Sequence, residues 1–297
     1  MIDAVVWLVV HLAGGIGDLA TALADPWAWL NWSDRQALAR FIYYGGSVEF
    51  FFVVLDIALI LFVAGLIRRP VLWAAVRAIE TFHNVVGRFI GWSILIMAIQ
   101  QIVIVVLQRI FRVSEIPLGP FGLILTRDIS WYSEELRLYN ATVVTLACAY
   151  TFVQGGHVRV DLIYAGLSHR KKRLMDMIGS LIFVLPLATV IWLYSWFFMW
   201  RHLVTPPVAA ADRLESLLRK ARIMKWNVET IGFSPNGFDG YFLFKILMVA
   251  FAGMLFLQGL NYFYRSYLEY VEGEAAADKY VDHDPPGDAA AEHGLHH

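Results

Sequence analysis

The sequence predicts an all-α, polytopic membrane helix bundle. Of its 297 residues, 59% are hydrophobic and 16% are charged, whereas soluble domains average about 45–50% and about 25%. The mean hydropathy is +0.57. Five apolar stretches reach the length of about 20 residues that a helix needs to cross about 30 Å of hydrocarbon. A soluble fold of this composition would lack the polar side chains needed to cover its surface.

The composition also excludes several classes of protein. The net charge of −1 lacks the basic excess typical of nucleic-acid binding. Cys148 is the only cysteine, which excludes a disulfide scaffold. The sequence contains no GxSxG, HExxH or P-loop motif. Haem held between helices requires histidines within the spans, and only His11 falls in a segment that could be one. We therefore expect no enzyme activity, cofactor, metal site or nucleic-acid partner.

The five predicted spans are Val48–Ile67, Phe89–Leu107, Leu136–Gly156, Met177–Trp200 and Tyr241–Tyr264. Each is largely free of charge in its middle, except that the first contains an aspartate, Asp56. Ionisable groups inside a membrane are usual candidates for function. Asp56 lies seven residues after Glu49, on one stripe of that span, and we interpret it as a polar contact across helices.

The first 23 residues allow two interpretations. Ile2–Leu23 is apolar enough to insert, but it contains Asp18 and three glycines, and no basic segment typical of a signal peptide precedes it. A sixth span and an interfacial helix both fit this pattern. Trp27, Trp29 and Trp32 follow, and they suit the membrane–water interface in either case.

Two further segments have the periodicity of amphipathic helices lying in the headgroup plane. In the first, apolar residues recur at helical spacing while a polar stripe occupies another face: Leu72, Val76, Ile79 and Val86 against Arg77, Glu80, Asn84 and Arg88. The second is Asp212–Val228. It carries a basic face that is a candidate docking surface for a partner: Arg219, Lys220, Arg222 and Lys225.

Basic residues in short loops predict the orientation. The densest basic cluster, Arg159 with Arg170–Arg173, follows the third of these spans and is placed in the cytoplasm. Arg68, Arg69 and Arg77 then fall on the same side. The basic 201–240 segment falls outside, against the rule, but long loops follow it poorly.

One constellation stands out at the two ends of the third span. Trp131, Glu134 and Glu135 open it, and Gly156, His157, Arg159 and Asp161 close it. Carboxylates suit the positive end of a helix dipole, and Ser133 is a candidate cap. Glu135 and His157 are 22 residues apart, about 33 Å along a helix. The acidic pair is therefore expected at one membrane face, and the His–Arg–Asp group at the other, where it pins a turn by charged hydrogen bonds.

With these motifs the chain resembles the enlarged form of the small, DctQ-like membrane subunit of tripartite ATP-independent periplasmic (TRAP) transporters. The resemblance covers roughly Val85–Gly166 and Met175–Leu268. The resemblance implies a four-span core, 85–268. Two departures from the family pattern are a long outer loop, 201–240, and an N-terminal extension, 1–84, with one or two membrane segments and the start of an interfacial helix. The acidic composition of the remaining residues, 269–297, predicts a disordered tail.

The resemblance also implies a function. A small permease subunit of the bacterial inner membrane would brace the scaffold of the large transport subunit. Sodium-coupled uptake of an organic acid would depend on a periplasmic solute-binding protein. The expected partners are therefore the large TRAP membrane subunit, the solute-binding protein and membrane lipids. The alternative is an independent oligomeric channel or carrier that uses Glu49 and Asp56.

Overall fold

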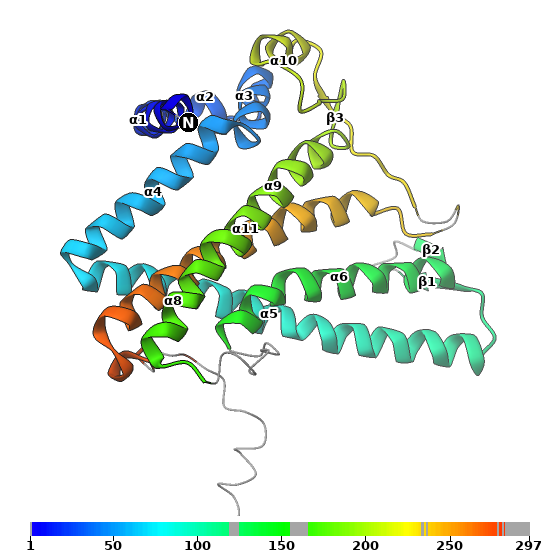
Figure 1. Ribbon diagram of the computed structural model, residues 1–297. Helices are drawn as coiled ribbons and strands as arrows, with labels where there is room; N and C mark the ends of the chain where they lie inside the picture. The colour runs from blue at the N-terminus through cyan, green and yellow to red at the C-terminus, as the bar shows by residue number, and fades with distance from the viewer. Residues whose placement is uncertain are drawn as a thin grey trace, which may run out of the picture.

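The computed structural model describes residues 2–118, 125–154, 166–232, 235, 237–277, 279–280 and 282. Within this part of the chain, six helical segments are long and apolar enough to cross a membrane (Figure 1). They are α1 (Ile2–Ala24), α4 (Val48–Ile67), α5 (Arg69–Arg109), α6 (Ile129–Val153), the run α8–η2–α9 (His169–Gly179, Ser180–Val184 and Leu185–Trp200) and α11 (Tyr241–Glu272). The predicted all-α membrane bundle is confirmed.

The remaining elements lie in the connections. Four of those in the described part of the chain are short helices: α2 (Trp27–Leu30), α3 (Arg35–Gly45), α10 (Leu214–Ala221) and the 3₁₀ turn η3 (Glu274–Ala276). Two antiparallel ladders join β1 (Glu115–Leu118) to β2 (Leu125–Asp128), with Glu115 opposite Asp128, and β3 (Val204–Thr205) to β4 (Lys225–Trp226).

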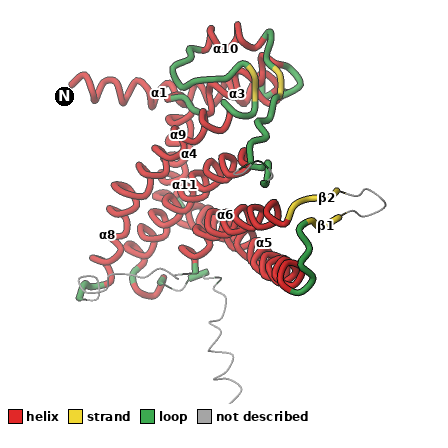
Figure 2. Tube along the Cα trace, turned by 90° about the vertical axis from the view of Figure 1, so that its right-hand side faces the viewer, coloured by secondary structure: helices red, strands yellow, loops and turns green. Residues whose placement is uncertain are grey.

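Residues 2–23 fold as one helix that packs on α4. At the crossing point, a Cβ atom on Gly15 would collide with Asp56 and crowd Phe52, so glycine lets the two helices approach closely. The rings of Trp7 and His11 lie 5.6 and 5.3 Å from that of Phe52. Figure 2 shows α1 projecting away from the other helices, with the N-terminus at its far end. Its length and composition suit a sixth span.

The predicted interfacial helix and the second predicted span are one continuous helix, α5. Its 41 residues extend about 60 Å, roughly twice the hydrocarbon thickness, so it must tilt or extend beyond the hydrocarbon. The expected solvated stripe is also wrong in part. Glu80 and Asn84 continue the buried stripe that Leu72 and Val76 begin, because they face α11 and neighbouring segments instead of water.

Helix α11 is the centre of the bundle. It contacts α5, α6, α8 and α9, and Figure 1 shows it beside α9 along much of its length. The run from α8 to α9 contains one π turn, Ser180–Val184, directly before Leu185 and Pro186. Proline has no N–H to donate to the preceding turn, and the wider turn is the local adjustment expected around it.

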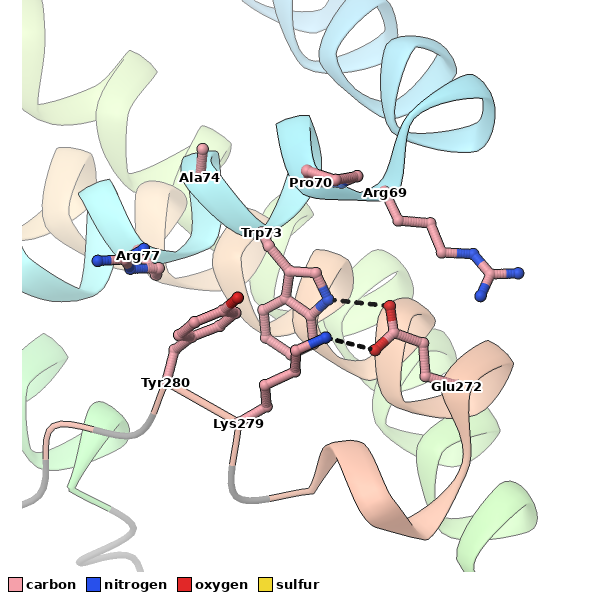
Figure 3. Close-up of a pocket in the computed structure, with 8 residues that line it drawn as sticks. All are labelled: Arg69, Pro70, Trp73, Ala74, Arg77, Glu272, Lys279 and Tyr280. Carbon is pink, nitrogen blue, oxygen red and sulfur yellow. Dashed lines mark hydrogen bonds and ion pairs between the residues drawn. The ribbon is translucent and has the colours of Figure 1, made fainter.

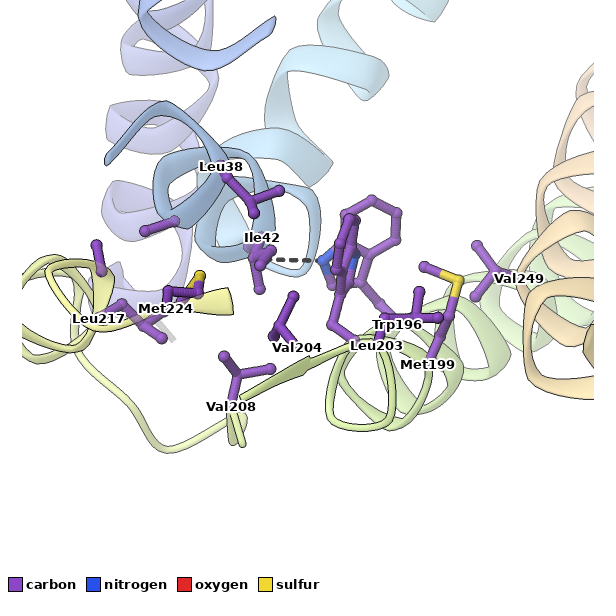
Figure 4. Packing of buried hydrophobic residues seen from close by; sticks show 13 residues of the cluster. Leu38, Ile42, Trp196, Met199, Leu203, Val204, Val208, Leu217, Met224 and Val249 are labelled. Carbon is purple, nitrogen blue, oxygen red and sulfur yellow. Dashed lines mark hydrogen bonds between the residues drawn. The ribbon is translucent and has the colours of Figure 1, made fainter. Parts of the chain in front are cut away.

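The outer segment 201–232 and α3 fold together as a cap. The predicted helix Asp212–Val228 is wrong in its second half, because α10 ends at Ala221 and the chain returns as β4 to pair with β3. The apolar side of α10 packs on α3, and both rest on the end of α9. Figure 4 shows this core, which includes Leu38, Ile42, Trp196, Met199, Leu203, Val204, Val208, Leu217 and Met224. Helix α3 of the N-terminal extension and the lengthened outer loop are therefore packed together.

The start of the expected disordered tail is ordered. Helix α11 continues to Glu272, and Glu269 within it is buried. Ala276 is buried after it, and Lys279 and Tyr280 contact Trp73 of α5. The tail prediction fails here because these residues bind back to α5. Residues 283–297 lie outside the described residues.

A glycine pair on α5 gives a matched stability test. A Cβ atom on Gly87 would collide with Tyr150 of α6, whereas one on Gly91 would meet nothing within 4 Å. Gly87→Ala is therefore expected to separate α5 from α6 and lower the free energy of unfolding by about 1–3 kcal/mol. Gly91→Ala is expected to have no such cost. Equal unfolding curves for the two variants in mixed micelles would show that the helices are not closely packed at Gly87.

Candidate functional site

The acidic pair at the start of α6 joins three parts of the bundle. Glu135 accepts a hydrogen bond from Gln100 of α5 at 3.0 Å and another from Tyr139 at 3.1 Å. Glu134 accepts one from the backbone N–H of Phe238, just before α11, at 2.9 Å. The pair therefore connects the start of α6 to α5 and to the segment just before α11.

Trp131 lies beside this pair. Its ring is 5.2 Å from that of Phe238, and the guanidinium of Arg127 lies 5.6 Å from its centre. Arg127 also pairs with Asp239 at 3.7 Å. The aromatic, acidic and basic groups thus lie close together at the start of α6 and the segment just before α11. Trp131 packs against the same segment that Glu134 binds.

Ser133 does not cap α6, contrary to expectation. The helix begins at Ile129, with Asp128 before it, so Ser133 lies inside and its hydroxyl donates to the carbonyl of Ile129 at 3.1 Å. The helix thus begins four residues before Ser133.

The other half of the constellation, Gly156, His157, Arg159 and Asp161, lies outside the described residues. Gln154 is the last described residue before it, and its side-chain amide donates to Asn84 of α5 at 3.0 Å. From Glu135 to Gln154 is about 28 Å along a helix. The acidic pair therefore lies at the opposite end of α6 from the segment that carries His157.

The four basic residues of the candidate docking surface do not share one environment. Arg219, Arg222 and Lys225 are exposed on the cap. Lys220 is partly buried, paired with Asp212 at 2.7 Å and directed at the carbonyl of Pro207. The cap therefore presents three of the four charges to solvent, while Lys220 holds its own loop together.

Asp56 and Glu49 occupy different surroundings. Asp56 is 4% exposed and faces Gly15 of α1. Glu49 lies in the first turn of α4, where Ser47 caps the helix by accepting from the N–H of Phe50 at 3.2 Å. A carboxylate in the first turn suits the helix dipole. The structure thus places Asp56 at a helix crossing and Glu49 at a helix start.

A buried ionic cluster that was not predicted from the sequence joins α5, α8 and α11. Arg265 donates to both oxygens of Glu80, at 2.7 and 2.8 Å, and pairs with Glu269 at 3.3 Å. Glu269 also pairs with Arg173 of α8. Asn261 donates to Glu80 at 3.2 Å. The sequence did contain a signal for this cluster. Residues 261, 265 and 269 repeat at intervals of four, which places them on one helix face.

Comparison with known proteins identifies the middle of the chain. Residues 122–211 match the family model for the tripartite ATP-independent periplasmic transporters, DctQ component. This region runs from just before α6 to the start of the cap, and it contains both the acidic pair and His157. No curated protein and no solved structure shows a significant match. The resemblance to the DctQ family found in the sequence motifs is confirmed over residues 122–211.

Proposed function

We propose that this subunit braces the static scaffold of the large TRAP transport subunit, so that a mobile part of that subunit can carry substrate. The DctQ match over residues 122–211 carries the proposal. Matched helix α6 is bound at both ends: Glu134 and Glu135 hold its start, and Gln154 holds its end to α5. A helix fixed at both ends suits a support.

Large apolar side chains on the outer faces of the helices support the same role. The side chains exposed in the isolated chain include Phe89 and Trp92 of α5, Phe183 just before α9 and Tyr194 within α9. A membrane protein covers such faces with lipid or with another helix. These faces offer the area that a large hydrophobic partner requires.

The remaining parts of the proposal follow from the transporter family. The protein would reside in the bacterial inner membrane and act without being an enzyme. Sodium coupling and selection of an organic acid would belong to the large subunit and the periplasmic binding protein. The His157, Arg159 and Asp161 group would pin the turn after α6 on the cytoplasmic side.

We also propose that the cap faces the periplasm and meets the solute-binding protein through Arg219, Arg222 and Lys225. The cap follows the end of α9, and the basic Arg170–Arg173 segment lies at the other end of the same helical run. Exposed charges mainly accelerate encounter and act less on final affinity. Lys220 is left out of the proposed docking face because its ammonium pairs with Asp212.

Reconstitution tests the proposed role. Vesicles that contain this chain alone are expected to show no organic-acid uptake and no ion current, whereas vesicles with both membrane subunits and the binding protein are expected to transport. Charge reversal at Arg219, Arg222 and Lys225 should then slow uptake more at low salt than at high salt, because salt screens exposed charges. Glu215→Lys, another charge reversal on the cap, is the control for general effects of altered charge.

Two outcomes would contradict these proposals. Sodium-driven uptake or a current from this chain alone would favour the independent channel or carrier, and loss of that activity in an Asp56→Asn variant would assign it to Asp56. Uptake by the full system that is equally slowed at low and high salt would argue against charge-guided docking on the cap.

A further inference from the structure

A cavity of about 220 Å³ lies between the start of α5 and the segment that follows α11 (Figure 3). Its charged and aromatic lining residues are three cations, two aromatic rings and one carboxylate: Arg69, Arg77, Lys279, Trp73, Tyr280 and Glu272. The cavity lies away from the acidic pair of α6 and from the cap.

The lining carries an excess of positive charge. Glu272 is already engaged, since it accepts from the indole N–H of Trp73 and from the ammonium of Lys279, both at 3.1 Å. Arg77 lies 4.9 Å above the ring of Tyr280. Among the described residues, neither Arg69 nor Arg77 forms an ion pair, and Figure 3 draws no bond to either guanidinium. One carboxylate against three cations leaves room for an added anion.

The position of the cavity indicates what kind of anion fits. It lies at the turn where α4 ends at Ile67 and α5 begins at Arg69. Ile60, Val63 and Ile67 are exposed on one face of α4 and lead to this turn. Tryptophan and arginine side chains at the end of a span suit the headgroup layer. An amphiphile would use both the cations and the apolar stripe, whereas free phosphate would use only the cations.

We propose that the cavity binds the headgroup of an anionic phospholipid. Arg69, Arg77 and Lys279 hold its phosphodiester, and its acyl chains run along Ile60, Val63 and Ile67 of α4. Basic pockets between helices on the cytoplasmic side favour such headgroups. The bound lipid joins the turn between α4 and α5 to the segment after α11. This role is independent of the proposed support of a large subunit.

Native mass spectrometry of the purified full chain tests the proposal with defined lipids. The chain is expected to retain phosphatidylglycerol in preference to phosphatidylcholine. Arg69→Gln with Arg77→Gln should weaken phosphatidylglycerol binding by about 10- to 30-fold, since each basic residue near an anionic headgroup contributes on the order of a fivefold effect. Arg109→Gln with Arg170→Gln removes the same charge from exposed positions elsewhere and should leave binding unchanged.

Glu272→Gln gives an independent readout because it keeps all three cations. It should tighten phosphatidylglycerol binding, whereas a purely structural role of Glu272 predicts unchanged or weaker binding, and either result would overturn the proposal. Equal binding by the Arg69/Arg77 variant and its control would also overturn it. Inorganic phosphate that raises the melting temperature as much as phosphatidylglycerol does would identify the site as one for free phosphate instead.

Discussion

Replacing Arg265 with methionine is expected to lower the free energy of unfolding by about 3–5 kcal/mol, the usual cost of removing one partner from a buried ion pair. The side chains of Arg265 and Glu80 are 14% and 8% exposed, so little water can replace the lost partner. Methionine fills a similar volume but neutralises the cation between Glu80 and Glu269. Two carboxylates would then face each other, with Arg173 left paired to the second.

The matched control is Arg88→Met, which makes the same substitution on an exposed pair. Arg88 and Asp282 lie 3.0 Å apart, with side chains 43% and 57% exposed. An exposed pair contributes about 0–1 kcal/mol. Unfolding of both variants in mixed micelles, followed by circular dichroism, measures the difference. If Arg265→Met costs no more than Arg88→Met, the buried cluster does not hold α5, α8 and α11 together.

The cluster also shows where sequence reasoning succeeds and where it stops. Helix α4 has the bounds predicted for the first strong span, because a charge-poor apolar run between Ser47 and Arg68 leaves few alternatives. The environment of the polar stripe that runs from Arg77 to Arg88 was harder to predict from the sequence. Periodicity places Glu80 on a face, but whether water or another polar group meets that face depends on Arg265, which is 185 residues away.

The candidate site follows the same pattern. The residue types at the start of α6 were predicted, whereas His157 lies outside the described residues. The partners of the acidic pair were not predicted, since Gln100 lies on another helix and Phe238 contributes only a backbone N–H. Such contacts depend on packing between distant segments. The cap was missed for a related reason: β3 and β4 are two residues long, too short for an alternating pattern.

The cap depends on a tryptophan of α9. Trp196 donates its indole N–H to the carbonyl of Ile42 at 2.8 Å and is 6% exposed. A Cβ atom on Gly45 would collide with its ring, so the end of α3 is shaped to admit it. Its ring lies 5.6 Å from that of Phe41. One side chain therefore fills the space between α9 and α3 and also satisfies a backbone carbonyl at the end of α3.

Trp196→Ala is accordingly expected to lower the free energy of unfolding by about 3–5 kcal/mol, the usual cost of truncating a buried tryptophan. Because the lost contacts lie between α9 and the cap, trypsin should cut the variant faster at Arg213, Arg219 and Arg222 than it cuts the wild type. Trp27→Ala is the control, since that side chain is 73% exposed. Faster cleavage within the cap by Trp196→Ala alone would show that the N-terminal extension and the outer loop are held together through α9. Global destabilisation with no change in the rate of cleavage at those three arginines would instead mean that the cap is held by α10 and α3 alone.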